Sequence, residues 1–194
     1  ILLLTKFGFF CIFLVTGIVF CSCRQRIVPS SVSLSDSVTW QSGDLIFRTG
    51  TSLESRLVTE LGGNRLTHVG ILVHSPGGWL VVHAATGEDD GDTDSVKCEM
   101  VRSFACGDRC KSVKVVHVSC DTAVTQRAVR FALQQIGKPF DADFDITDTT
   151  KYYCTELVWQ AYRHQHVDLS HGRRHHIQLL GLKKTCILPV DLLP

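Results

Sequence analysis

The stretch THVGILVHSPGGWLVVH, residues 67–83, contains two β-rich runs separated by a turn. Val69 to Val73 and Trp79 to Val82 are rich in β-branched and aromatic residues, and the Pro and Gly residues between them are typical of a hairpin turn. An antiparallel hairpin brings His68, at the start of the first run, close to His83, at the end of the second. In the register that pairs these histidines directly, their side chains share one face of the sheet.

The segments around this hairpin predict an α+β domain, in which a small antiparallel sheet is packed against helices. The expected strands outside the hairpin are residues 45–48 and 114–118, and the expected helices are residues 51–61, 121–136 and 154–163. Thr51 has capping-box spacing to Glu54, and Asp121 is a typical N-cap. Gly137 and Pro139 end the second helix. Residues 88–95 and the acidic residues 141–150 are expected to be loops.

The charge balance argues against a nucleic-acid partner. The chain has 194 residues, with 20 Lys and Arg against 19 Asp and Glu. Lys6 is the single charged residue in positions 1–23, so the remainder carries 19 basic and 19 acidic side chains. A neutral body without a basic stripe is not typical of nucleic-acid binding. Its length fits one domain, residues 40–194.

The first 39 residues predict delivery to a membrane or beyond it. Residues 7–20 are almost entirely apolar, follow a lysine, and end near Cys21 and Cys23. Residues 1–23 therefore fit a signal peptide, a lipoprotein signal or a membrane anchor. The Ser- and Val-rich residues 24–39 are expected to form a tether. The expected location is the cell envelope of a bacterium, with the domain membrane-anchored or exported.

Cys154 is the candidate nucleophile because it is expected to begin the last helix. Unpaired N–H groups and the positive end of the dipole at a helix start favour a thiolate and lower the pKa of the thiol. The plainer alternative is a buried structural cysteine. A thiolate nucleophile needs a base, and the base needs an orienting partner, so His68 and His83 are candidates for these roles. The alternative for each histidine is a half-exposed residue at a strand end.

Four motifs in order resemble the permuted NlpC-type papain-like cysteine hydrolases of the YiiX/YebB-like branch. The motifs are GDLIF at 43–47, THVGI at 67–71, GKPFDADFD at 137–145 and YYCTEL at 152–157. The resemblance covers about residues 40–166. It implies a circularly permuted papain-like fold with Cys154 as nucleophile and His68 as base. The third polar position, often acidic in this branch, is His83 here, as in the related lecithin retinol acyltransferase-like enzymes.

The implied chemistry is acyl transfer through an acyl-enzyme. Backbone N–H groups at the start of the Cys154 helix and a donor from Tyr153 are the candidates for holding the oxyanion. The leading hypothesis is an amidase or peptidase acting on cell-wall peptide or another small amide, without a cofactor. One alternative, suggested by His83 and the apolar leader, is a thiol-dependent acyltransferase or lipid hydrolase. The other is an inactive membrane-anchored binding module.

The remaining polar clusters are given plainer interpretations. Cys98, Cys106, Cys110 and Cys120 lack a Cys-x-x-Cys pair, so disulfides in an exported domain are more plausible than zinc. The histidines at 164, 166, 171, 175 and 176 are expected to lie in a solvated tail, and no metal site is predicted. Asp44 is expected to stabilise a turn. Lys138 and the acidic residues at 141, 143, 145 and 148 could line the substrate cleft, but solvated loop charges are the preferred interpretation.

Overall fold

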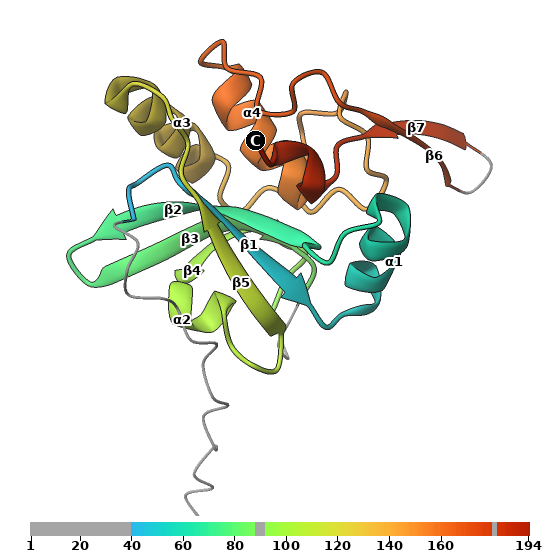
Figure 1. Ribbon diagram of the computed structural model, residues 1–194, viewed down its shortest axis with the longest axis horizontal. Coiled ribbons are helices and arrows are strands. Elements are labelled where there is room, and N and C mark those ends of the chain that lie inside the picture. Colours follow the sequence, from blue (N-terminus) through green and yellow to red (C-terminus); the bar gives the residue numbers. More distant parts are fainter. Residues whose placement is uncertain (1–39, 88–91, 180–181) are drawn as a thin grey trace, which may run out of the picture.

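A five-stranded antiparallel sheet forms the centre of the computed structural model, which describes residues 40–87, 92–179 and 182–194 (Figure 1). The strand order is β4-β3-β2-β1-β5. The strands are β1 (Leu45–Gly50), β2 (His68–Ser75), β3 (Gly78–Ala85), β4 (Ser95–Met100) and β5 (Cys110–Val116). The expected leader and tether, residues 1–23 and 24–39, lie outside the described residues.

Helices cover both faces of the sheet. They are α1 (Leu53–Gly62), α2 (Val101–Phe104), α3 (Thr122–Gln134) and α4 (Cys154–Arg163). In Figure 1, α3 and α4 lie on one side of the sheet and the short α2 lies on the other. The prediction of an antiparallel sheet with packed helices is therefore confirmed.

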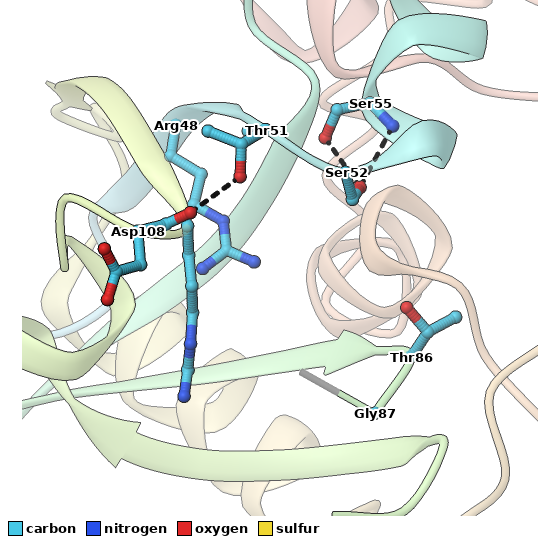
Figure 2. A pocket seen from close by; sticks show the side chains of 9 residues that line it. Arg48, Thr51, Ser52, Ser55, Thr86, Gly87 and Asp108 are labelled. Atoms are coloured by element: carbon cyan, nitrogen blue, oxygen red, sulfur yellow. Dashed lines mark hydrogen bonds between the residues drawn. The ribbon is translucent and has the colours of Figure 1, made fainter. Parts of the chain in front are cut away.

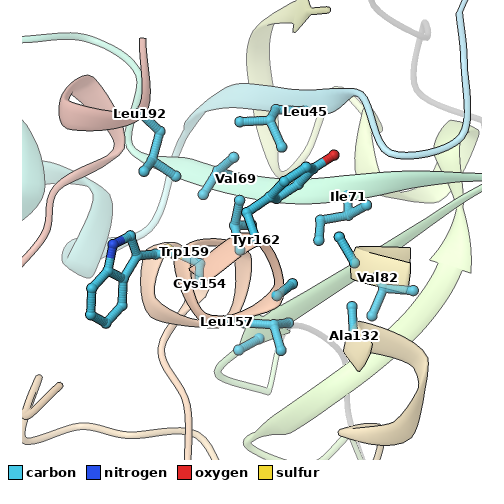
Figure 3. Close-up of a cluster of buried hydrophobic side chains, with 14 of the residues drawn as sticks. Leu45, Val69, Ile71, Val82, Ala132, Cys154, Leu157, Trp159, Tyr162 and Leu192 are labelled. Carbon is cyan, nitrogen blue, oxygen red and sulfur yellow. The ribbon is translucent and has the colours of Figure 1, made fainter. Parts of the chain in front are cut away.

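Alternation along the strands creates two separate cores. The core beneath α3 and α4 contains Phe47, Val69 and Ile71, which pack against Leu157 of α4 (Figure 3). The opposite face buries another set of side chains, including Phe104 of α2. Residues of opposite parity on β2 and β3 therefore face different layers.

The hairpin forms as predicted, but its register differs by two residues. Ser75 pairs with Gly78 and Ile71 pairs with Val82, because the turn is centred on the Pro76–Gly77 bond. Continuing this register places His68 opposite Ala85 rather than opposite His83. A shift of two residues preserves the side-chain face, so the two histidines become diagonal neighbours.

The helix caps are partly as expected. Asp121 caps α3, and its side chain accepts a hydrogen bond from the N–H of Ala123 at 2.7 Å. The predicted capping box at Thr51 is wrong, because Ser52 is the N-cap of α1 and accepts from the N–H of Ser55. The helix starts one residue later than the box requires, and Ser52 has the extended backbone of an N-cap.

Several elements have no counterpart in the sequence prediction. Strand β4 and helix α2 were not predicted, nor was the C-terminal hairpin of β6 (His175–Leu179) and β7 (Leu182–Cys186), which precedes a 3₁₀ turn at Pro189–Leu192. The interpretation of the last histidines as a solvated tail is wrong for His175, whose Nε2 lies 3.0 Å from the Asp191 carboxylate. Asp191 is itself buried and fixes this end of the chain.

The acidic loop after α3 is built around Asp141, so the interpretation of this residue as a solvated charge is wrong. Asp141 is fully buried and accepts hydrogen bonds from the N–H groups of Asp143 and Asp145. The ammonium of Lys151 lies 2.9 Å from its carboxylate and bridges to Asp143. This network orders the chain that leads directly into α4.

None of the helices among the described residues has the length and apolar character needed to span a membrane.

Candidate active site

Cys154 is the first residue of α4, as predicted. The chain enters the helix through Tyr153, which has an extended backbone and no side-chain cap. The apolar side of α4 packs on the sheet, and Cys154 lies at the edge of this core with 8% of its surface exposed (Figure 3). Its sulfur is 3.6 Å from Oγ1 of Thr155 and also interacts with the backbone of Val69. The thiol therefore lies against the first residues of β2.

His68 and His83 are in direct contact. His68 Nε2 is 2.8 Å from His83 Nδ1, and the two rings are nearly perpendicular. His83 is completely buried, whereas His68 is partly exposed. Both rings pack on Phe104, with ring centroids 5.7 and 5.2 Å away. The predicted juxtaposition of the two imidazoles is thus present despite the shifted register.

Glu99 on β4 continues this series of contacts and was missed by the sequence analysis. His83 Nε2 lies 2.9 Å from Oε1 of Glu99, and Arg109 Nη1 lies 3.2 Å from Oε2. Although burial alone would raise the pKa of Glu99, the hydrogen bond from His83 and the charge of Arg109 lower it. Glu99 is therefore an ionised acceptor at neutral pH. The alternation of Val96, Cys98 and Met100 was a sequence signal for this strand.

The surroundings of His68 favour a neutral imidazole. Burial and then the positive charge of Arg48 hold the pKa of His68 well below its ordinary value of 6.5. Arg48 is itself buried, donates from Nη1 to the carbonyl of Phe104 at 3.0 Å, and lies over the Phe104 ring. The guanidinium is thus fixed beside the histidine pair.

The thiol of Cys154 is also neutral at rest. Burial raises its pKa above the ordinary 9.0, and hydrogen bonds with Thr155 and the Val69 backbone offset only part of this effect. The predicted lowering of the thiol pKa by the helix start is therefore wrong, because desolvation of the thiolate outweighs the favourable end of the helix.

Cys154 and His68 line the same small cavity of about 50 Å³. Its wall is partly apolar, with Val58, Phe140 and Phe144. A larger pocket of about 260 Å³ adjoins it and shares some of its lining residues (Figure 2). The shared residues are Arg48, Ser52, Ser55 and Thr86. A substrate could therefore extend from the thiol into a wider, more polar space.

Tyr153 has a structural position. Its side chain is buried in a cluster with Cys186 and Leu188, and its hydroxyl accepts a hydrogen bond from the N–H of Ile187 at 2.9 Å. It thereby ties α4 to the C-terminal segment. This placement does not support the predicted oxyanion donor from the Tyr153 side chain, and the residue is not among those that line the Cys154 cavity.

Asp44 has the structural role that was expected of it, and the acidic loop contributes aromatic rather than charged side chains to the cavity. Asp44 stabilises the predicted turn by accepting from the N–H of Gln41 at 2.9 Å. Lys138 donates to the carbonyl of Thr149, away from the cavity wall, and from the acidic loop it is Phe140 and Phe144 that line the cavity.

The cysteines and histidines of the described residues form no metal cluster. Within these residues, no group of three or more His, Cys, Asp or Glu side chains is placed to hold a metal ion. Cys98, Cys106, Cys110 and Cys120 are free thiols, as are Cys154 and Cys186. The disulfides considered among the first four are thus not formed in this structure.

Comparison with known proteins relates this fold to a described family. A family model described as a permuted papain-like amidase enzyme, YaeF/YiiX, C92 family, matches residues 39–180. The crystal structure of metalloprotein yiiX from Escherichia coli O157:H7 is similar, with a TM-score of 0.65 and 20% identity, covering 78% of this chain and 91% of that chain. No match is found among curated proteins. The matched residues include Cys154, His68 and His83.

Proposed function

Because the chain belongs to the permuted papain-like amidase family and is a cysteine hydrolase, we propose that Cys154 is its nucleophile and His68 its base. The single observation that carries this proposal is that Cys154 and His68 line one cavity while His68 Nε2 is held by His83. This leaves Nδ1 of His68 as the nitrogen that can accept the thiol proton. His83 is proposed to orient the base.

The neutral resting pair supports a mechanism in which proton transfer and attack occur together. His68 Nδ1 takes the thiol proton as the sulfur of Cys154 attacks the carbonyl carbon of the substrate. The resulting oxyanion is held by backbone N–H groups in the first turn of α4, which lack partners within the helix. The imidazolium then protonates the leaving amine as the C–N bond breaks, and a thioester remains.

Water completes the reaction. His68 takes a proton from the water molecule as its oxygen attacks the thioester carbonyl. The second tetrahedral intermediate collapses, the C–S bond breaks, and the sulfur recovers the proton from His68. Free acid leaves, and the neutral pair is restored.

We propose a small amide or peptide, such as cell-wall peptide, as the substrate. The narrow cavity beside the thiol suits a slender acyl group, and the adjoining polar pocket suits a peptide-like extension. The second candidate is a thiol-dependent acyltransferase or lipid hydrolase, which His83 in place of an acidic residue favours. Peptide amides, acyl thioesters and phospholipid vesicles, assayed side by side, separate the two. Turnover of phospholipid alone would reject the amidase.

The nucleophile is tested by alkylation with iodoacetamide and peptide mass spectrometry. Cys154 should react faster at neutral pH than Cys186, whose pKa burial raises to about 11, and faster than the exposed Cys98, which serves as the internal reference. His68→Ala should abolish this preference while leaving the labelling of Cys98 unchanged. Equal rates at Cys154 and Cys98 in the unmodified protein would overturn the assignment.

We also propose that residues 1–23 direct the domain to the cell envelope, where an amide of the cell wall is within reach. The apolar residues 7–20 support this proposal. Membrane fractionation of cells expressing the full chain, compared with a chain starting at residue 24, tests it. Equal recovery of both forms in the soluble fraction would reject an envelope location.

A further inference from the structure

We propose that Glu99 is a positioning residue that fixes the tautomers of both histidines, so that His68 presents an unprotonated Nδ1 to the thiol. The inference rests on the proposed roles of Cys154 and His68. It adds a residue of β4 to the site, one that acts on the base through His83.

The contacts form one continuous series. Glu99 Oε1 is 2.9 Å from His83 Nε2, and His83 Nδ1 is 2.8 Å from His68 Nε2. His83 is fully buried between the two, so its ring nitrogens meet protein groups rather than bulk water. Glu99 is mostly buried, with 16% of its side chain exposed. Geometry therefore couples the carboxylate to the base through one imidazole.

Tautomer choice then follows from donor and acceptor counting. An ionised carboxylate can only accept, so His83 Nε2 must carry the hydrogen. A neutral His83 then has a lone pair on Nδ1, which can only accept from His68 Nε2. His68 therefore carries its hydrogen on Nε2 and has a lone pair on Nδ1, the arrangement that a base needs.

Arg109 determines how an amide at position 99 would orient. A guanidinium has only donors, and Arg109 Nη1 lies 3.2 Å from Oε2 of Glu99. In Glu99→Gln, the amide oxygen is expected to turn to Arg109, which leaves the NH₂ group facing His83. An NH₂ group donates, so His83 would accept at Nε2 and donate from Nδ1. The hydrogen of His68 would then be displaced to Nδ1, where it blocks the base.

The charge balance gives Glu99 a second effect. Positive groups around the histidine pair come from three segments: Arg48 on β1, Lys97 on β4 and Arg109 before β5. Lys97 is paired with Asp92. Glu99 is the carboxylate in contact with His83, and it stabilises the positive charge that His68 acquires when it takes the thiol proton. Its removal therefore disfavours the same step that the tautomer change blocks.

The experiment compares Glu99→Gln and Glu99→Asp with Glu60→Gln, an exposed change of the same chemistry on α1. Iodoacetamide is the probe, and the alkylation rate of Cys154 is measured from pH 5 to 9. In this step the sulfur bonds to carbon, iodide leaves, and the thiol proton passes to His68. Imidazole ¹⁵N NMR reports which ring nitrogen of His68 and His83 carries hydrogen, and thermal unfolding reports stability.

We expect Glu99→Gln to slow alkylation of Cys154 at neutral pH by about 10- to 100-fold, the range of losses for groups that orient a metal-bound imidazole. The NMR signals should show that the hydrogen of His68 has moved from Nε2 to Nδ1. Glu99→Asp keeps the acceptor and should retain the original tautomers with a smaller loss of rate. Glu60→Gln should match the unmodified protein.

Unchanged tautomers in folded Glu99→Gln would overturn the inference, whatever the rate. A fall in melting temperature with normal tautomers would reduce Glu99 to a structural residue and also overturn it. The proposed nucleophile fails by a different result, namely equal labelling of Cys154 and Cys98 in the unmodified protein. In that case the NMR comparison still decides the tautomer assignment.

Discussion

Gly70 lies opposite His83 across the β2–β3 pair, and alanine at this position is expected to damage both stability and the histidine contact. An added Cβ would lie 2.4 Å from Cγ1 of Val81, 2.9 Å from the carbonyl oxygen of Val82 and 3.1 Å from Cβ of His83. The Val81 side chain is buried, and the Val82 contact is backbone, so neither can move freely. The strands must therefore separate locally or His83 must shift.

The magnitude follows from two opposing effects. Overpacking a well-packed core costs about 1–3 kcal/mol. Replacing a strand glycine with alanine recovers about 0.5–1 kcal/mol of backbone entropy. Because the closest contacts involve the neighbouring strand, the net loss should be about 1–2 kcal/mol. In a domain of this size that corresponds to a fall in melting temperature on the order of 2–8 °C.

Gly77→Ala provides the matched control. Gly77 lies in the turn of the same hairpin, and the nearest atom to an added Cβ is Oγ of Ser75 at 4.0 Å. Its stability should change by less than about 0.5 kcal/mol. Urea unfolding of both variants measures the difference, and alkylation of Cys154 by iodoacetamide reports whether the histidine contact survives. If Gly70→Ala is as stable and as reactive as Gly77→Ala, the close packing of His83 against β2 is refuted.

Three further outcomes are expected. The alkylation rate of Cys154 should stay constant through neutral pH and decrease only below pH 6.5, because the lowered pKa of His68 keeps its imidazole unprotonated. Above pH 9 the rate should increase, because the thiol itself ionises. Tyr153→Phe should reduce stability by about 1–3 kcal/mol, because the buried N–H of Ile187 loses its acceptor, without changing that rate; a selective loss of rate would restore Tyr153 as an oxyanion donor. Burial raises the pKa of Glu156 from 4.5 to about 9, so between these pH values the folded state binds more protons than the unfolded state. The free energy of unfolding should therefore fall as pH rises, by at most about 1.4 kcal/mol per pH unit. Melting curves recorded across this pH range should lose that slope in Glu156→Gln.

The sequence predicted the parts of the fold that have strong local signals. The hairpin was predicted from its Pro and Gly residues, α3 from Asp121, and α4 from the amphipathic run after Cys154. The register could not be fixed, because the turn residues allow pairings that differ by two and leave the same side-chain face. The C-terminal hairpin was missed because it is held by contacts outside its own two strands, such as the ion pair of His175 with Asp191.

The site was predicted in its central residues but not in its surroundings. The meeting of His68 and His83 follows from hairpin geometry, which is local. Glu99 reaches His83 only through the neighbouring strand β4, which was not predicted, and Arg109 joins the site through Glu99. The thiol pKa was predicted in the wrong direction because burial of Cys154 depends on how α4 packs, which the sequence does not state. Burial set by long-range packing is therefore needed to predict a pKa shift, whereas the site residues can be recognised from local motifs.

Glu156 shows how burial shapes the charge around the helix start. It lies in the first turn of α4 and is completely buried. An ionised carboxylate there would interact with the positive end of the helix and weaken its attraction for a thiolate or an oxyanion. Because burial, with a smaller contribution from Asp141, raises the pKa of Glu156 to about 9, the group is uncharged at neutral pH. Burial therefore both makes the thiol harder to ionise and keeps the nearby carboxyl group uncharged. The positive end of α4 is then not offset by this carboxyl group, which favours the oxyanion site that we propose there.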